Sequence, residues 1–316
     1  MSSKSKLVVF GATGQQGSSI LITVLNHPEL SKKYSLRGIT RNASGSKALA
    51  LAEKGIELVE ADLDDPSSLP RAVEGAHTIV LITETRYEAD LKAREFRHAK
   101  SVADAAVSAG VEFLIFSTAV HCARLWDNGP VDQFDSKAEI EGYIRSLPLK
   151  SAFIAPGMFM TNLGTSMAPR KQEDGSYAVI GANDPHTRIP LIETVADFGH
   201  YAVPLLKDPE GMNGKVMYAA TKLYSFSEMV EIISRVSGET VRYVQIPGEV
   251  YAGFMKGEMG NRMVAMMNFI DEPGYYGPGT EEKVRETVAI VEGKLTTFEE
   301  FAGKYCTDLE AAGGAH

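Results

Sequence analysis

Three glycines near the start of the chain have the spacing of a phosphate-binding turn. Gly11, Gly14 and Gly17 follow the apolar stretch Leu7–Phe10 at intervals of three residues. Glycine lets a chain turn sharply, lets backbone approach a pyrophosphate, and lets a helix pack closely on a strand. The helix expected over Ser18–Leu25 would offer unpaired first-turn N–H groups, which attract phosphate. The pattern predicts a dinucleotide-binding turn, although its G-x-x-G-x-x-G spacing differs from the standard G-x-G-x-x-G fingerprint.

Basic residues follow the second expected strand, Tyr34–Thr40. No acidic residue occurs between Glu29 and Glu53, whereas Arg41 stands at the strand end and Lys47 follows it. In dinucleotide-binding units an Asp or Glu at this place binds the ribose 2′-hydroxyl, and an Arg accommodates a 2′-phosphate instead. The sequence therefore predicts NADP(H) rather than NAD(H) as the cofactor, and a solvated basic loop is the alternative interpretation.

His121 and Cys122 follow the expected strand Glu112–Thr118, near the expected position of the nicotinamide. His121 is a candidate for proton transfer, with an ordinary polar surface residue as the alternative. Cys122 is predicted to be an inert packed thiol, because nothing around it in the sequence indicates the electropositive setting that a reactive thiol needs. No cluster of His, Cys, Asp and Glu has the spacing of metal ligands, so no metal site is expected.

Alternating strands and helices are expected to position these residues. The expected strands of the first half are Leu7–Phe10, Tyr34–Thr40, Glu57–Ala61, Thr78–Thr83, Glu112–Thr118 and Ser151–Ala155. Helical segments lie between them, including Glu88–Ala109, which Gly110 ends, and a helix that Asp135 or Ser136 can cap and that runs through Leu147. This alternation predicts an α/β fold with a doubly wound parallel sheet, which binds ligands at the carboxyl ends of its strands.

The second half of the chain has a different pattern, in which Gly, Pro and other turn residues are frequent, as in Gly181–Pro190. Its strand-like and helical segments are Tyr177–Ile180, Val216–Ala220, Val241–Ile246, Glu193–Leu206, Ser227–Ser237, Glu249–Ile270, Glu281–Glu292 and Phe298–Tyr305. We expect a cofactor-binding domain over 1–157 and a smaller C-terminal α/β lobe over 158–316 that binds substrate or partner, with room for some elements to return to the first sheet.

Composition narrows the class of protein. The 316 residues carry a formal net charge of −9, which disfavours nucleic-acid binding because that requires clustered Lys and Arg. No apolar stretch approaches the ~18 residues of a membrane span, and the N-terminus lacks the apolar run of a signal peptide. Two cysteines cannot form a disulfide framework. We therefore expect a cytoplasmic protein.

Several motifs together resemble one family. They are GATGQQG (11–17), TRN (40–42), EADLDDPSSL (60–69), FSTAV (116–120), FDSKAEIEGYIR (134–145), APGMFMTNL (155–163), TVADFGHYAVPLL (194–206) and TFEEFAGKY (297–305). The combination resembles the NmrA-like family of atypical short-chain dehydrogenase/reductases. This resemblance implies a Rossmann-type domain with a smaller lobe and NADP(H) as ligand. Its members divide between cofactor-sensing regulators and enzymes.

The resemblance also implies a role for Lys137. It matches the lysine that short-chain reductases place over the nicotinamide ribose, where it lowers the pKa of a general-acid tyrosine. That tyrosine is missing, because Gln133 stands four residues before Lys137. Three interpretations remain open: a sensor without chemistry, another proton donor, or a cationic substrate that needs no proton. The candidate donors are His121, Tyr143 and Tyr87, and the candidate carboxylates for stabilising a cationic substrate are Glu84, Asp132 and Asp135.

The predicted catalytic residues are Lys137, His121 and Tyr143. The predicted cofactor-binding residues lie in the glycine turn and near the ends of the expected strands: Gly11, Thr13, Gly14, Gln15, Gln16, Gly17, Arg41, Lys47, Asp62, Leu63, Thr83, Ser117, Lys137, Pro156, Gly157 and Phe159.

Two features indicate an apolar ligand. Trp126 follows the fifth strand and is placed to form a pocket wall, and Met255, Met259, Met263, Met266 and Met267 have near-helical spacing. The methionines fit either a helix core or a pocket for a bulky apolar substrate. The favoured prediction is an NADP(H)-dependent oxidoreductase acting on a bulky hydrophobic small molecule, a carbonyl or an imine or iminium. The alternative is a non-catalytic NADP(H) sensor that binds a protein partner.

Overall fold

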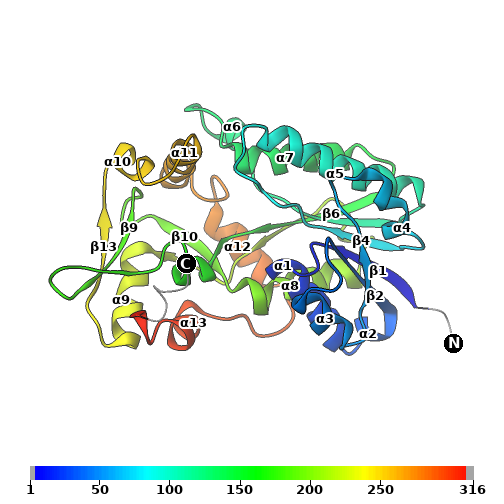
Figure 1. Cartoon of the computed structure of the whole chain (residues 1–316), viewed down its shortest axis with the longest axis horizontal. Helices are drawn as coiled ribbons and strands as arrows, with labels where there is room; N and C mark the ends of the chain where they lie inside the picture. The colour runs from blue at the N-terminus through cyan, green and yellow to red at the C-terminus, as the bar shows by residue number, and fades with distance from the viewer. Residues whose placement is uncertain (1–3, 311–316) are drawn as a thin grey trace.

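A parallel sheet of seven strands forms the centre of the computed structural model, which describes residues 4–310 (Figure 1). The strand order is β11 (Val216–Ala219), β6 (Lys150–Pro156), β5 (Phe113–Ser117), β4 (Thr78–Leu81), β1 (Ser5–Phe10), β2 (Tyr34–Thr40) and β3 (Glu57–Glu60). All neighbouring pairs are parallel. The order reverses between β1 and β4, which creates a crevice at their carboxyl ends. The predicted doubly wound α/β sheet is confirmed.

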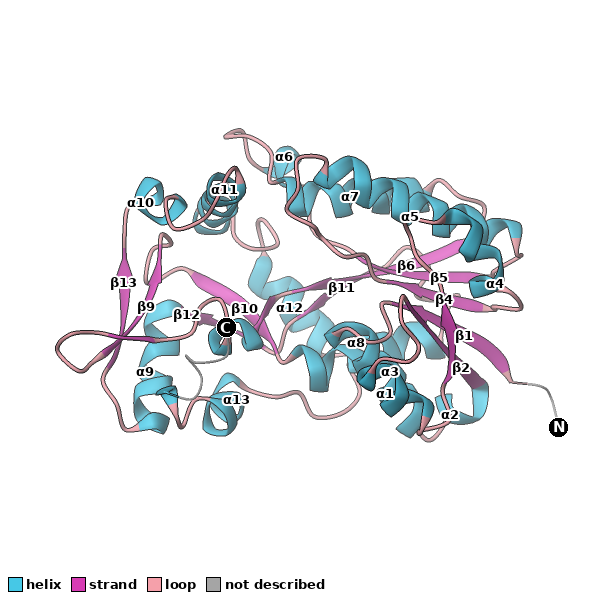
Figure 2. Ribbon diagram, viewed as in Figure 1, coloured by secondary structure: helices cyan, strands magenta, loops and turns pink. Residues whose placement is uncertain are grey.

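Helices cover both faces of this sheet (Figure 2). One layer holds α1 (Gln15–Asn26), α2 (Leu30–Lys33), α3 (Ser46–Ala52) and α8 (Thr194–Lys207); the other holds α4 (Leu69–Val73), α5 (Leu91–Ser108) and α7 (Asp132–Arg145). The α1 and α8 helices touch at Gly199, where a Cβ would lie 2.2 Å from Thr23 Oγ1. The Gly199 N–H donates to Ser19 Oγ over 2.9 Å. A helix from the second half of the chain thus packs tightly on the first domain.

The smaller lobe contains two three-stranded sheets. One has the order β12 (Lys222–Ser225), β10 (Arg188–Ile192), β7 (Met158–Phe159), and the other β13 (Val241–Gln245), β9 (Tyr177–Gly181), β8 (Arg170–Lys171). The remaining helices are α6 (Cys122–Leu125), α9 (Phe226–Ser237), α10 (Gly248–Ala252), α11 (Met259–Asp271), α12 (Thr280–Val288) and α13 (Phe298–Tyr305), with 3-10 turns η1 (Pro66–Ser68) and η2 (Met160–Gly164). Buried aromatic residues such as Phe226, Phe269 and Phe298 share one core here.

Two elements of the second half, one strand and one helix, belong to the large sheet and the helices that cover it. The strand expected over Val216–Ala220 is β11, which pairs with β6 at the sheet edge, and the helix expected over Glu193–Leu206 is α8. The chain therefore crosses back after Phe159, as the expected division at residue 157 allowed. Among residues 4–310, no helix is long and apolar enough to cross a bilayer.

The single helix expected over Glu249–Ile270 is wrong, because α10 and α11 are separate helices there. Gly257 adopts a φ of 60° between them, a left-handed conformation that ends helical geometry. Gly260 then lets the two helices meet, since a Cβ at that position would lie 2.2 Å from the Ala252 carbonyl oxygen. Apolar spacing alone did not reveal this break.

Two further boundaries differ from expectation. Helix α7 begins at Asp132, and its N-cap position is Val131 rather than Asp135 or Ser136. Asp135, the fourth residue of this helix, instead reaches back and accepts the Val131 N–H over 2.9 Å. Within the turn-rich stretch Gly181–Pro190, strand β10 begins at Arg188, because β12 and β7 pair with it on either side.

Candidate functional site

The glycine turn joins β1 to α1 with its helix N-terminus open. Gly11 has a φ of 73°, and the Gly14 N–H donates to its carbonyl over 3.0 Å. Gly17 packs against this turn so closely that a Cβ would lie 2.2 Å from the Gly11 carbonyl oxygen. No side chain caps α1, which begins at Gln15. Its first N–H groups are therefore available to an anion.

A cavity of about 430 Å³ opens beside this turn, at the carboxyl ends of β1, β2 and β4. It is lined by Phe10, Gly11, Thr13, Gly14, Ile39, Thr40, Arg41, Lys47, Ala61, Asp62, Leu63, Asp64, Ile82, Thr83, Glu84, Arg86 and His98. The predicted cofactor residues among them are Gly11, Thr13, Gly14, Arg41, Lys47, Asp62, Leu63 and Thr83. The uncapped helix, the open face of Gly14 and the basic side chains fit the phosphates of a dinucleotide.

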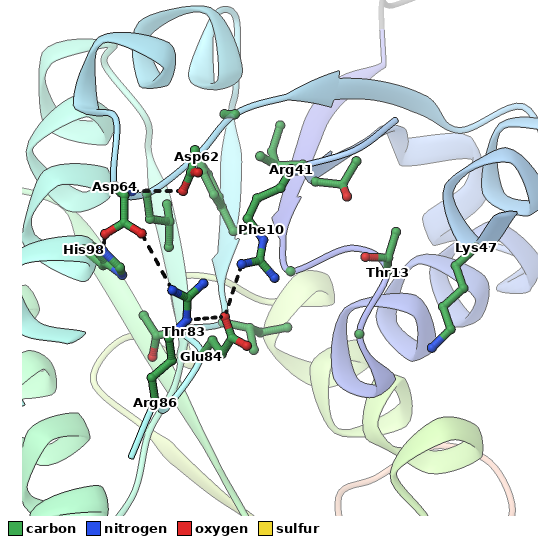
Figure 3. Close-up of a pocket in the computed structure, with 17 residues that line it drawn as sticks. Phe10, Thr13, Arg41, Lys47, Asp62, Asp64, Thr83, Glu84, Arg86 and His98 are labelled. Atoms are coloured by element: carbon green, nitrogen blue, oxygen red, sulfur yellow. Dashed lines mark hydrogen bonds and ion pairs between the residues drawn. The ribbon is translucent and has the colours of Figure 1, made fainter. Parts of the chain in front are cut away.

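The basic side chains of this cavity face a carboxylate (Figure 3). Arg41 Nη1 lies 3.6 Å from Glu84 Oε2, and Arg86 Nε donates to the same oxygen over 3.1 Å. Lys47 lies across the opening from them (Figure 3). Among the described residues, no carboxylate lies within 4.0 Å of its ammonium. Two cations of the pocket, Arg41 and Arg86, are therefore paired with Glu84, and Lys47 is not.

A second charge cluster, around Asp64, lies beside the first. Asp64 accepts from Arg94 Nη2 over 2.5 Å and lies 2.7 Å from His98 Nε2. The hydrogen bonds from Arg94 and His98 lower the pKa of Asp64 to about 2. Arg86 Nη1, 3.9 Å from Asp64, links this cluster to Glu84. The pocket thus carries interleaved charges of both signs.

Lys137 lies next to Thr83, which lines this pocket, and it forms an ion pair with a buried carboxylate. Its ammonium contacts Glu95 Oε1 and donates to Thr83 Oγ1 over 3.2 Å. Glu95 is 2% exposed and also accepts hydrogen bonds from Thr83 (2.7 Å) and Ser136 (2.6 Å). An ammonium has three donors, and the third finds no acceptor within the described part of the chain. Lys137 therefore has a fixed position and one open N–H.

The surroundings of Glu95 keep it ionised. Burial alone would raise the pKa of Glu95, but the charge and hydrogen bond of Lys137, with the hydroxyls of Ser136 and Thr83, lower it below its ordinary value. Sequence reasoning missed Glu95, which lies in the first turns of the long helix α5. A signal was present, since a Glu among the small residues of the buried face of α5 must find a partner.

Other predicted cofactor residues form hydrogen bonds near the carboxyl edge of the large sheet. Gln16 Nε2 donates to Ser117 Oγ over 2.8 Å, and Gln15 Oε1 accepts from Thr161 over 3.1 Å. They tie α1 to the end of β5 and to η2. None of the four lines the 430 Å³ cavity.

The predicted cofactor-binding residues at the end of β6 and just after it have a role in packing. A Cβ on Gly157 would lie 2.4 Å from the Pro190 carbonyl oxygen, so this glycine lets the backbones before β7 and within β10 approach. Phe159 packs, half-buried, against the core of the large sheet. Pro156, Gly157 and Phe159 do not line the cavity either.

The candidate proton donors have separate locations. His121 Nδ1 lies 3.0 Å from Asp135 Oδ1. Tyr143 lies six residues after Lys137 in α7, where its hydroxyl contacts Asp104 and accepts from Lys100 over 3.0 Å. These contacts connect Tyr143 to α5 rather than to the pocket. The structure does not bring Tyr143 together with Lys137.

Tyr87 is affected by the charge of Glu95, the partner of Lys137. Desolvation of its hydroxyl and the charge of Glu95 raise the pKa of Tyr87, while Arg262 opposes them. Tyr87 thus remains protonated at neutral pH. By contrast, burial and then Asp135 raise the pKa of the Cys122 thiol, which agrees with an unreactive, buried cysteine.

Gln133 occupies the position of the missing tyrosine. Its side chain is 4% exposed, and its Nε2 donates to the Arg262 carbonyl over 3.2 Å. The carbonyl oxygen of its amide finds no hydrogen-bond donor within residues 4–310. Gln133 therefore connects α7 to α11 and offers no titratable proton. The candidate carboxylates Asp132 and Asp135 are also engaged, with Arg262 at 3.8 Å and with Val131 and Ala123.

Trp126 and the methionines divide between core and surface. Trp126 stacks edge-on against Phe269 and donates from Nε1 to Glu272 over 2.7 Å. It lines a second, more open cavity between α10 and α11. Met267 is buried and Met266 packs on the core, whereas Met259 is 37% exposed. The stripe is therefore not a continuous pocket wall.

Comparisons with known proteins agree with this architecture. The chain is 28% identical to the NmrA-like family domain-containing oxidoreductase malD of Malbranchea aurantiaca, over 95% of this chain and 96% of that protein. The negative transcriptional regulator NmrA, solved in complex with NAD and with NADP, has a TM-score of 0.79 at 21% identity over 98% of both chains. Citrobacter sp. triphenylmethane reductase complexed with NADP(H) has a TM-score of 0.75 at 22% identity, over 95% of this chain and 99% of that one.

These two solved structures share the fold of this chain, and the sequence similarity to malD extends over nearly the whole of both chains. The sequence pattern of the NmrA-like family matches residues 3–302. The chain belongs to the NmrA-like family.

Proposed function

We propose that this chain is an NADP(H)-dependent oxidoreductase that transfers hydride to or from a bulky hydrophobic small molecule, a carbonyl or an imine or iminium. The observation that carries this proposal is the Lys137 ammonium. Buried Glu95 fixes it, it adjoins Thr83 in the wall of the dinucleotide cavity, and it has one N–H free for a ribose hydroxyl. A cofactor sensor needs phosphate contacts, but it has less need of a charge fixed at the expected nicotinamide end.

The other residues have separate tasks in this proposal. The N–H groups after Gly14 bind the pyrophosphate, and Arg41 and Lys47 bind the 2′-phosphate. When bound, the nicotinamide supplies or accepts the hydride. Lys137 orients its ribose, and such positioning of reacting groups affects rate steeply. The oxidoreductase malD, related over the whole chain, supports this class of activity.

A proton donor is required only for some substrates. A carbonyl reduced to an alcohol gains a hydride on carbon and a proton on oxygen, whereas an iminium gains only the hydride. Gln133 cannot supply the proton, and Tyr143 contacts α5 instead. For carbonyl substrates, Tyr87 and His121 are the candidate donors, and for an iminium no donor is needed.

The experiment is NADPH oxidation by the purified protein with a panel of carbonyl, imine and iminium compounds. We expect turnover with at least one bulky apolar compound. Lys137→Met should reduce kcat about 100-fold or more while NADPH affinity changes less than about fivefold. Tyr143→Phe is the matched control and should retain normal kcat. Full kcat in Lys137→Met would contradict the proposed role.

A sensor remains the second candidate, for one reason: Gln133 replaces the general acid. Its hydrogen bond runs to α11. The side chains of Val250, Phe254 and Met259, at the start of α11 and just before it, are exposed. These apolar residues suit a protein contact. Tight NADP(H) binding without turnover on the whole panel would favour this candidate over the enzyme.

A further inference from the structure

Glu84 lies between two arginines at the mouth of the dinucleotide cavity (Figure 3). Its Oε2 is 3.6 Å from Arg41 Nη1 and accepts from Arg86 Nε over 3.1 Å. The side chains of Arg41 and Glu84 are 58% and 60% exposed. The pair is therefore formed in contact with solvent, where a ligand can compete with either member.

The fold brings the Glu84 carboxylate next to Arg41, in a segment of the chain that has no acidic residue of its own. Arg41 follows β2 and Glu84 follows β4, and β1 lies between these two strands in the parallel sheet. The carboxyl ends of parallel strands meet at one edge, so Glu84 reaches Arg41 from a distant part of the chain. The segment between Glu29 and Glu53 contains no acidic residue. In the folded protein, however, the carboxylate of Glu84 lies beside Arg41.

The two groups have opposite preferences for the adenosine ribose. A carboxylate accepts hydrogen bonds from ribose hydroxyls, and an acid near this place binds the 2′-hydroxyl in NAD-preferring units. A guanidinium binds the 2′-phosphate, which carries between one and two negative charges at neutral pH. A phosphate that reaches Arg41 must share it with Glu84 or displace Glu84, and both alternatives cost free energy.

We propose that Glu84 sets the ratio of NAD(H) to NADP(H) affinity, by opposing the 2′-phosphate at Arg41 and by accepting the 2′-hydroxyl of NAD(H). This inference deepens the proposed function and rests on it. Arg86, which also lies 3.9 Å from Asp64, holds Glu84 at the pocket wall. Lys47 supplies a second cation for the phosphate. The pocket therefore accepts both dinucleotides, with a smaller preference for NADP(H) than Arg41 alone would give.

The test is calorimetric titration of Glu84→Gln, which keeps the shape of the side chain and removes its charge. We expect NADP⁺ to bind about three- to tenfold more tightly, because repulsion between close exposed charges is modest in water. The amide of Gln still offers an acceptor, so NAD⁺ should bind equally or at most about fivefold more weakly. The fragments 2′,5′-ADP and 5′-AMP should show the same pattern, since the effect is confined to the adenosine end. At 0.5 M salt the difference should shrink.

Glu88→Gln is the matched control. It removes the same charge from the same loop, but Glu88 pairs with Arg94 at 2.8 Å and does not line the cavity. Its affinity ratio should equal that of the unsubstituted protein. An unchanged ratio in Glu84→Gln, or an equal change in Glu88→Gln, would overturn this inference alone. Failure of the unsubstituted protein to bind either dinucleotide would overturn the proposed function as well.

Discussion

Two ion pairs differ mainly in burial: Arg41 and Glu84 line the cavity, whereas Lys137 and Glu95 contact Thr83 in its wall. Arg41 and Glu84 are both more than half exposed, whereas Lys137 is 19% and Glu95 2% exposed. Exposed pairs contribute little to stability and exchange partners readily, but breaking a buried pair leaves an uncompensated charge. The first pair can therefore respond to the ligand that enters, and the second can only hold a group in place. In the proposed function, cofactor choice thus depends on one pair and cofactor orientation on the other.

The largest expected effect comes from the turn on which both ends of the site depend. In Gly14→Val, dinucleotide binding should fall below detection, because the new side chain occupies the face that a pyrophosphate approaches. The fold should remain, since a Cβ on Gly14 meets only the Gly11 carbonyl oxygen, at 3.3 Å. Calorimetric titration with NADP⁺ and NAD⁺, together with thermal unfolding, measures the two effects separately.

Gly17→Ala gives the contrast for that variant. Its Cβ would lie 2.2 Å from the Gly11 carbonyl oxygen, so α1 must move and the protein should be strongly destabilised. If Gly14→Val bound NADP⁺ normally, the phosphate-binding turn would lie elsewhere. The two ion pairs could then not be assigned to the two ends of one dinucleotide site.

The buried pair should produce the next largest effect. Lys137→Met leaves the Glu95 carboxylate buried without a counter-charge, and the free energy of unfolding should fall by about 3–5 kcal/mol. In the double variant Glu95→Gln/Lys137→Met no charge is left unpaired, so most of this loss should be recovered. Urea denaturation of the single and double variants measures the coupling. Simple additivity of the two changes would show that the pair does not act as a unit.

The same pair predicts a dependence of stability on pH. Glu95 has a pKa below its ordinary value of 4.5 in the folded protein. Its contribution is therefore fully present above the unfolded pKa and is lost as pH falls through the folded pKa. Denaturation midpoints should decline below about pH 4.5 more steeply in the unsubstituted protein than in Glu95→Gln/Lys137→Met. Equal slopes would place the acid sensitivity in other carboxylates.

These variants also mark how far the sequence predicted the molecule. The glycine turn, the strands around it and Arg41 at a strand end depend on local patterns, and the structure has them where the sequence predicted them. Glu84 and Glu95 act through contacts between strands or helices distant in sequence, and no spacing within one segment reveals such contacts. The break between α10 and α11 has a related cause, because close packing of Gly260 on Ala252 overrode the helical pattern of the methionines.

Arg41→Ala tests the exposed pair from the side of the cation. It should weaken NADP⁺ binding by about 1.5–3 kcal/mol, as for loss of hydrogen bonds to a charged group, and should change NAD⁺ binding little. The Lys47 ammonium remains and limits the loss. Titration of both dinucleotides measures the difference. An equal loss for NADP⁺ and NAD⁺ would mean that Arg41 contacts a part common to both, and the adenosine end would not select the cofactor.

The smallest effect should come from the exposed cluster around Asp64. Arg94 and His98 hold the pKa of Asp64 at about 2, so the Asp64 carboxylate is charged throughout the ordinary pH range. Asp64 is nevertheless 44% exposed, and without it Arg94 keeps Glu88 as a partner at 2.8 Å. Asp64→Asn should therefore lower Tm by less than about 2 °C, far less than Lys137→Met. A fall in Tm as large as that of Lys137→Met would show that burial does not separate the two kinds of ion pair, and the division between a replaceable and a fixed pair would have to be abandoned.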